Sequence, residues 1–537
     1  MNLTKKLAFP FIIVVFSILY LFSAWVADDA YITFRTIENF HQGYGLRWNI
    51  DERVQSYTHP LWMLNLLIGK YVIDDLYILS ILLGCLFTSC TLYVLYQVTK
   101  KNLPIFFISS LLFLASKAVI DFSSSGLENS LSYALIGLFF INIVKNKETK
   151  FFYLTTSLIL SAMFLNRMDL IIAFLPFALY LFFIEAYKLR HLKHSITQGL
   201  IGFIPVVLWS GFAIYYYGSF FANSVIAKTN IGLPRSHLHI QGFKYFYENL
   251  IYDPYTLSLI LVTTVFALVS KQTVHKLLGI GLVCYCFYLL SVGADYMFGR
   301  FLTVPFTVCI FLIASASQTL ILSKKTSVIL SSIASILVAI NVYQYTFKDT
   351  SKFITNNTAI TDERMFYYQS TGLLPYLSTG KQGILFHFQE TNDLLITDPN
   401  QPSILFTMGF NGYLAAKFFP NKHIIDLLGL TDNYLAAHPM NYGYWRIGHF
   451  RRVISNDYLA SISENKNLMS DPQDAYVLQQ AWLLSRAPLN DPQRIKAIIN
   501  WHTGYTFKQA KEAFARYPHA RLMNHEAKEL KNLWIPH

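Results

Sequence analysis

The chain has 537 residues, of which 54% are hydrophobic and only 14% are charged, against about 25% charged residues in typical soluble domains. This composition excludes an ordinary soluble globular protein and indicates a polytopic membrane protein. The net charge of +12 could indicate nucleic-acid binding, but the basic residues recur in short groups between apolar segments. Their placement is the positive-inside pattern of membrane proteins, so no nucleic-acid partner is expected.

Eleven apolar segments are predicted to cross the membrane as helices, although some fall short of the roughly 20 residues that a span needs. With the N-terminus in the cytoplasm, basic groups such as Lys5-Lys6 and Lys324-Lys325 all lie on the cytoplasmic side. We therefore expect a multi-pass protein of a bacterial inner membrane, with its C-terminal part outside the cytoplasm. The predicted spans are 7–27, 76–99, 103–121, 129–144, 151–166, 170–186, 197–217, 255–270, 277–292, 301–322 and 326–346.

The first outer loop, residues 28–75, is predicted to be partly helical. Residues 31–41 lack glycine and proline, and Gly43 and Gly45 then break the run. The apolar stretch 60–73 is too short to span the membrane and is expected to lie as a helix in the interface, with Trp62 and Lys70 as anchors.

The tail after the last apolar segment is long enough to form its own domain. Its pattern is mixed α/β, with strands predicted at 382–388, 403–408 and 423–428 and helices at about 412–418, 474–486 and 506–517. We therefore expect an all-α transmembrane domain of about eleven helices over residues 1–346. An extracytoplasmic α/β domain is expected over residues 347–537.

An adjacent pair of carboxylates, Asp28 and Asp29, stands where the first apolar segment ends. Two acids are costly to desolvate at a membrane boundary, so the pair indicates either simple solvation at the interface or a functional site. Oxygen ligands could also hold a hard divalent cation here, and the sequence leaves that open. No Cys/His spacing typical of zinc is present.

The predicted outer face also gathers other charged side chains, which suggest a reaction with an anionic leaving group. A carboxylate can take the proton of an acceptor hydroxyl, while Arg and Lys hold a phosphate. Alternatively, each acid merely pairs with a base and keeps the boundary neutral, and Arg300 could extend its charge toward water from the mouth of a span. The acids are Asp28, Asp29, Glu128, Asp169 and Asp295, and the bases are Arg35, Arg53, Arg167, Lys228 and Arg300.

Several segments, taken in order, resemble the GT-C superfamily of membrane glycosyltransferases. The resemblance is strongest to the branch that contains the mycobacterial terminal arabinofuranosyltransferases and related bacterial proteins. The motifs are DDAYITFR, GYGLRWNIDERVQSYTHPLW, SSSGLENSL, NRMD, YYYGSFFANSVIAK, GADYMFGRF, IIDLLGLTD and WRIGH, at residues 28–35, 43–62, 123–131, 166–169, 215–228, 293–301, 424–432 and 445–449.

The resemblance implies transfer of a sugar from a polyprenyl-phosphate donor to an envelope glycan, glycolipid or protein outside the cytoplasm. It implies a catalytic acid in the first outer loop, at Asp28 or Asp29, and we favour Asp28 because it comes first in the motif. It further implies Arg35, Lys228 and Arg300 as ligands of the donor phosphate. Residues implied to line the cavity are Tyr31, His59, Glu128, Arg167, Asp169 and Asp295. It does not fix the donor sugar.

Two other functions fit parts of the sequence. A transporter or flippase of a lipid-linked sugar would also carry charged residues at membrane depth, but such proteins often contain inverted repeats, and none is visible here. A non-catalytic assembly protein could bind envelope glycan through its tail, although eleven spans exceed what anchorage needs.

Overall fold

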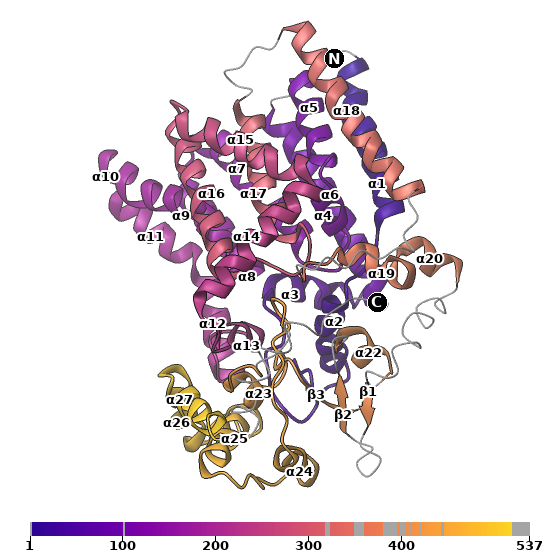
Figure 1. Cartoon of the computed structure of the whole chain (residues 1–537). Helices are drawn as coiled ribbons and strands as arrows, with labels where there is room; N and C mark the ends of the chain where they lie inside the picture. The colour runs from indigo at the N-terminus through magenta and orange to yellow at the C-terminus, as the bar shows by residue number, and fades with distance from the viewer. Residues whose placement is uncertain are drawn as a thin grey trace. The chain divides into compact units, whose positions relative to one another are not determined.

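The protein divides into two compact units, each built from segments that are far apart in the sequence. Unit 1 comprises Met1–Ala27, His59–Val207 and Arg235–His387, and unit 2 comprises Asp28–Thr58, Leu208–Pro234 and Phe388–His537. The computed structural model (Figure 1) describes residues 3–99, 102–316, 323–347, 359–379, 395–397, 404–407, 411–418, 420, 422–441 and 445–517.

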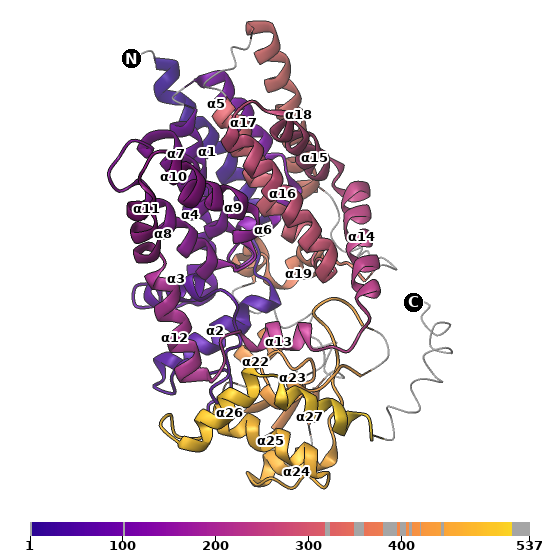
Figure 2. The same ribbon diagram turned by 90° about the vertical axis from the view of Figure 1, so that its left-hand side faces the viewer.

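Unit 1 is a bundle of helices. Within it α4 packs on α7, α16 on α9 and α11 on α8 (Figure 2). Its helices are α1 (Leu3–Ser23), α3 (Pro60–Gly69), α4 (Leu76–Val98), α5 (Leu103–Leu114), α6 (Lys117–Ser123), α7 (Asn129–Asn146), α8 (Phe152–Asn166), α9 (Leu170–Leu179), the π-helix Tyr180–Glu185, α10 (Ala186–Lys188), α11 (Leu192–Gly202), the first residues of α12 (Ile204–Tyr217), α14 (Arg235–Tyr252), α15 (Pro254–Val269), α16 (Thr273–Val292), the 3-10 turn Arg300–Leu302, α17 (Thr303–Ala316), α18 (Lys324–Phe347), α19 (Glu363–Thr371) and α20 (Leu373–Ser378).

Each of the eleven predicted spans overlaps a helix in the described residues, but the predicted number of crossings is not confirmed. Among the described residues, three helices are long and apolar enough to cross a membrane, at Leu76–Val98, Leu170–Lys188 and Thr273–Val292. Up to six cross if each bent helix pair counts as one span. The bends are 74° between α5 and α6, 40° between α11 and α12, and 111° between α14 and α15. Hydropathy along the chain does not report such breaks.

The helix expected at the membrane interface is present as α3, but Trp62 is not an exposed anchor. Its side chain is only 1% exposed, and its ring N–H donates to the carbonyl oxygen of Gly126 at 2.9 Å. Because a buried indole needs a partner for its N–H, this bond fixes α3 against the turn before α7. Lys70 is buried as well and pairs with Asp74 at 2.7 Å.

Unit 2 combines a small sheet with two groups of helices. The strands have the order β1-β2-β3: β1 (Leu395–Thr397) runs antiparallel to β2 (Ile404–Thr407), and β2 runs parallel to β3 (His423–Asp426). Helix α22 (Asn411–Phe418) forms the crossover between the two parallel strands, as parallel pairing requires. The other helices are α2 (Asp28–His41), the rest of α12, α13 (Asn223–Thr229), α23 (Asn433–Ala437), α24 (Asn456–Glu464), α25 (Pro472–Ser485), α26 (Pro492–His502) and α27 (Tyr505–Phe514).

Two apolar cores stabilise unit 2. One brings together Ile32 of α2, Trp48, Ala415 of α22 and Ile424 of β3. The other joins the C-terminal helices and α13, and it includes Leu435, Val477, Leu484, Ala497 and Trp501. Helices α25 and α26 begin where the sequence signals a start, because Asp471 and Asp491 cap them and a proline follows each aspartate.

The predicted secondary structure of the tail is largely confirmed. The strands at 403–408 and 423–428 correspond to β2 and β3, and the helices at 412–418, 474–486 and 506–517 correspond to α22, α25 and α27. The strand expected at 382–388 lies outside the described residues. The strand β1 was not expected. The expected domain boundary between residues 346 and 347 stays a prediction, and the compact units place residues 28–58 in unit 2.

Candidate active site

Asp28 is the first residue of α2, and its carboxylate also lies at the first turn of α22. Oδ1 accepts the backbone N–H of Tyr413 at 2.8 Å, and Oδ2 accepts that of Gly412 at 3.1 Å. The first N–H groups of a helix have no partner within the helix, and the helix dipole places partial positive charge there. The Asp28 carboxylate therefore accepts two backbone N–H groups of α22 while it stands in the first turn of α2.

Gly412 allows this close approach. A Cβ atom at position 412 would lie 1.9 Å from the backbone oxygen of Asp28, a distance that real Cβ atoms do not adopt. Any other residue would force the start of α22 away from Asp28. The ring of the next residue, Tyr413, packs edge-on against Tyr31 with centroids 4.9 Å apart, which further fixes α22 against α2.

The pKa of Asp28 is raised to about 7, mainly because burial penalises the charged carboxylate. The N–H groups of Tyr413 and Gly412 lower it, and the charge of Asp29 raises it, without reversing the effect of burial. A carboxyl group with this pKa exchanges its proton near neutral pH, as a general base requires. Asp29 is the more exposed member of the pair.

Arg35, two turns further along α2, holds backbone carbonyls. Its guanidinium donates to the oxygens of Trp48 at 2.9 Å, Ala415 at 2.7 Å and Lys422 at 2.8 Å. It also lies over the Trp48 ring, 4.8 Å from the centroid. Burial lowers its pKa to about 10, so the side chain stays charged at neutral pH. Arg35 thus joins α2, α22 and the entry to β3.

A second polar cluster lies in unit 1, where several helix ends meet around Glu128. The Glu128 carboxylate precedes α7 and lies 3.1 Å from Nη2 of Arg300, 3.3 Å from Nδ1 of His59 and 3.8 Å from Nε of Arg167. Arg167 also forms a two-pronged pair with Asp169, at 2.6 and 3.1 Å. Asp295 lies 3.7 Å from Nη1 of Arg300.

The charged side chains of this cluster pair with one another. Burial alone would raise the pKa of Glu128, but Arg300, His59 and Arg167 outweigh it and lower that pKa to about 2. Glu128 is therefore ionised at neutral pH. Two arginines face three carboxylates, so a further anion would have to displace one of them. This arrangement supports a tightly paired network more directly than a site for a phosphate.

Lys228 lies in unit 2, in the last turn of α13, and its side chain is exposed. It lies near His449, as its effect on the pKa of that histidine indicates. Lys228 therefore belongs to a group of basic side chains within unit 2.

The structure groups the predicted site residues by unit. His59, Glu128, Arg167, Asp169, Asp295 and Arg300 come together in unit 1, while Asp28, Asp29, Tyr31 and Arg35 share α2 in unit 2. Their assigned roles stay predictions.

Three participants were not expected from the sequence. The backbone N–H groups of Gly412 and Tyr413 lie 384 and 385 residues from Asp28, and no local pattern signals such a contact. The Tyr285 hydroxyl, which donates to Asp169 at 2.8 Å, lies in an apolar helix that reads simply as a span.

No cluster of metal-ligating side chains is found in the described part of the chain. No group of three or more His, Cys, Asp or Glu side chains there is arranged to hold a metal ion. The two oxygens of Asp28 already accept backbone N–H groups.

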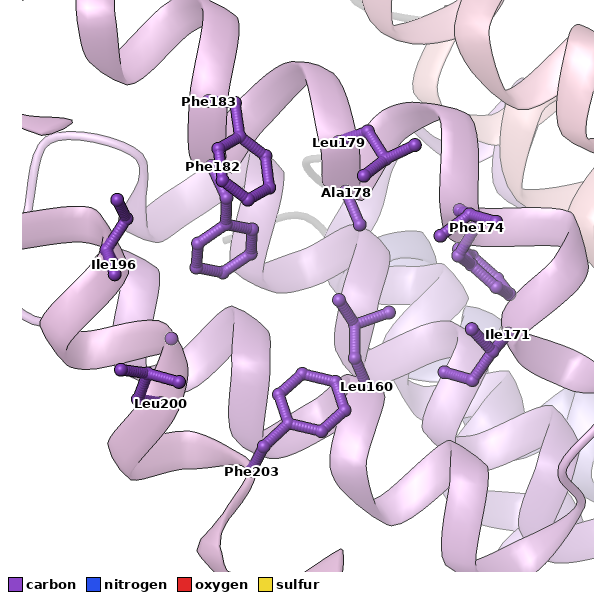
Figure 3. Close-up of a pocket in the computed structure, with 12 residues that line it drawn as sticks. Leu160, Ile171, Phe174, Ala178, Leu179, Phe182, Phe183, Ile196, Leu200 and Phe203 are labelled. Carbon is purple, nitrogen blue, oxygen red and sulfur yellow. The ribbon is translucent and has the colours of Figure 1, made fainter.

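Unit 1 also contains an apolar pocket of about 230 Å³ between α8, α9, the following π-helix and α11. Figure 3 shows Leu160, Phe182 and Phe203 around the same space. Its twelve lining residues are eleven apolar side chains and one glycine. The pocket suits hydrocarbon and offers no group for chemistry.

Comparison with known proteins gives one distant relative. The chain is 26% identical over 226 residues to the terminal beta-(1->2)-arabinofuranosyltransferase of Mycobacterium tuberculosis (strain ATCC 25618 / H37Rv). The match covers 39% of this chain and 35% of that protein, so it spans about a third of the relative's length. No family model and no solved structure matches the chain. The similarity is thus to a glycosyltransferase, and it agrees with the sequence resemblance at the level of the family alone.

Proposed function

We propose that this protein is a membrane glycosyltransferase that moves a sugar from a polyprenyl-phosphate donor to an acceptor hydroxyl outside the cytoplasm, with Asp28 as general base. The observation that carries the proposal is the buried Asp28 carboxylate, fixed by two backbone N–H groups and with its pKa raised to about 7. The distant similarity to an arabinofuranosyltransferase supports the reaction class.

In the proposed reaction the Asp28 carboxylate takes the proton of the acceptor hydroxyl. The hydroxyl oxygen then forms a bond to the anomeric carbon of the donor sugar. The bond between that carbon and the phosphate oxygen breaks, and polyprenyl phosphate leaves with the electron pair. A phosphate leaving group is stable as an anion, so cationic side chains suffice to stabilise it without a strong general acid.

The geometry favours different roles for the three cations implied by the resemblance. Arg35 donates to three carbonyls and is 2% exposed, so we assign it to holding α2 and α22 together. Arg300 pairs with Glu128 and lies near Asp295, and its role toward phosphate stays a prediction. Lys228 is exposed and is the strongest candidate of the three for the donor phosphate.

The proposal is tested with the purified full-length protein in vesicles. Polyprenyl-phosphate sugars of several kinds are supplied with envelope glycan acceptors, and products are identified by mass spectrometry. The expected result is transfer of one sugar with release of polyprenyl phosphate. Movement of lipid-linked sugar across the vesicle membrane without any transfer would overturn the proposal in favour of a flippase.

A further inference from the structure

A tight turn in unit 2 presents two basic side chains on one face. Arg446 and His449 pair as an antiparallel bridge, and the N–H of His449 donates to the carbonyl of Arg446 at 2.9 Å. Gly448 makes the turn with φ of +78°, a conformation that favours glycine. Directly opposed residues of an antiparallel pair point to the same side, so the two side chains emerge together.

The contact between these side chains defines the state of the histidine. Nη2 of Arg446 lies 2.8 Å from Nε2 of His449. A guanidinium can only donate, so Nε2 must accept and carries no proton. Burial, followed by the charge of Arg446, lowers the pKa of His449 well below its usual value, and Lys228 and Arg451 lower it further. His449 is therefore a neutral ring among three cations.

A buried arginine holds Lys228 beside this turn. Arg452 is 2% exposed and donates to the carbonyls of Phe450 at 2.7 Å and Leu435 at 3.1 Å. Its Nη2 also donates to the carbonyl of Ala227, the residue before Lys228, at 2.6 Å. The end of α13 is thus tied to residues 446–452, and both lie within unit 2.

Two cations of this group, Lys228 and Arg451, differ from the arginines around Glu128, which pair with carboxylates. Within the described part of the chain, neither Lys228 nor Arg451 forms an ion pair, and both side chains are exposed. Like charges held close together repel each other, and an anion bound beside Lys228 and Arg451 would offset that repulsion. Arg supplies paired donors and Lys a mobile point charge, which together suit the oxygens of a phosphate.

We infer that Lys228, Arg446 and Arg451 form a binding site for a phosphate ester, with His449 holding the Arg446 guanidinium in place. This assignment rests on the proposed function, under which the phosphate is that of the polyprenyl-linked donor. Arg446, His449 and Arg451 would then join Lys228 as residues of the donor site.

The test measures binding of a short-chain polyprenyl phosphate to the full-length protein in detergent, with inorganic phosphate and phosphatidylglycerol as parallel probes. Replacing Lys228, Arg446 or Arg451 by Gln should weaken polyprenyl phosphate binding about tenfold or more, the usual effect of losing a charge-assisted hydrogen bond. Arg446→Lys should restore part of the loss. Lys466→Gln, at an exposed lysine in unit 2, is the matched control and should change nothing.

Wild-type affinity in all three folded Gln variants would overturn the site. If phosphatidylglycerol binds as tightly as polyprenyl phosphate and is weakened by the same variants, the assignment of the site to the donor would be wrong. Binding needs no turnover, so the two proposals fail separately. If the Gln variants weaken binding but no sugar is transferred, the proposed glycosyltransferase activity is wrong and the phosphate site stands. If sugar is transferred and the Gln variants bind normally, only the proposed phosphate site is wrong.

Discussion

Replacing Gly412 by alanine should separate Asp28 from the start of α22. The new Cβ would lie 1.9 Å from the Asp28 backbone oxygen, while real Cβ contacts stay beyond 3.0 Å, so the two segments must move apart by about 1.1 Å. The N–H bonds from Tyr413 and Gly412 start at 2.8 and 3.1 Å. Such a shift takes both beyond the roughly 3.5 Å at which a hydrogen bond is lost.

The loss of these bonds has a defined consequence for the proposed base. Each hydrogen bond to a charged group stabilises it by about 1.5–3 kcal/mol, and a pKa unit corresponds to about 1.36 kcal/mol. The pKa of Asp28 should therefore rise further above 7, by roughly one unit or more. Displacement of a catalytic group by about 1 Å also costs on the order of a hundredfold in rate.

The assay is kcat/KM for sugar transfer in vesicles between pH 5.5 and 9. We expect Gly412→Ala to lower the rate at pH 7 by about ten- to a hundredfold and to move the pH midpoint upward. Gly211→Ala is the control, because a Cβ at Gly211 meets nothing within 4 Å. An unchanged midpoint and rate in a folded Gly412→Ala protein would refute the link between α22 and Asp28.

Three further predictions concern proton uptake, stability and Arg35. Wild-type kcat/KM should rise with pH and level off above about 7, because Asp28 must lose its proton to act, and a flat profile would contradict its role. Glu128→Gln should destabilise unit 1 by about 3–5 kcal/mol near pH 7, since it leaves Arg300 and Arg167 without their shared carboxylate. The lowered pKa of Glu128 stabilises the fold above about pH 4.5, and this contribution disappears as pH falls toward 2, so thermal melts of wild type and Glu128→Gln should converge in acid while exposed Glu464→Gln follows wild type. Arg35→Lys should lower the melting temperature and leave the KM for the donor unchanged, because lysine cannot serve three carbonyls, whereas a raised KM with normal stability would restore Arg35 as a phosphate ligand.

Structural features that depend on neighbouring residues in the sequence, such as helix ends, were predictable. The lack of glycine and proline before Gly43 predicted most of α2, and both Gly43 and Gly45 adopt the positive φ that ends it. The apolar runs likewise predicted many of the helices of unit 1, but not α14, α19 or α20, which lie outside the predicted spans. The number of times these helices cross the membrane was not predictable, because hydropathy does not detect a bend such as the 111° between α14 and α15.

The side chains around Asp28 and Glu128 were predictable as polar outliers, but their partners were not. Glu128, Arg167 and Arg300 each stand at the end of a helix, so a charged cluster at helix ends could be expected from the sequence. Asp28 instead bonds to backbone N–H groups almost 400 residues away, which no side-chain pattern encodes. Gly412 was expected only to mark a turn before a helix.

The most direct test of the central claim compares sugar transfer by Asp28→Asn and Asp29→Asn in the same vesicles, with folding checked by thermal melting. If Asp28 is the base, Asp28→Asn should lose about a hundredfold or more of kcat, while the more exposed Asp29 tolerates the change better. Transfer at the wild-type rate by well-folded Asp28→Asn protein would contradict the claim.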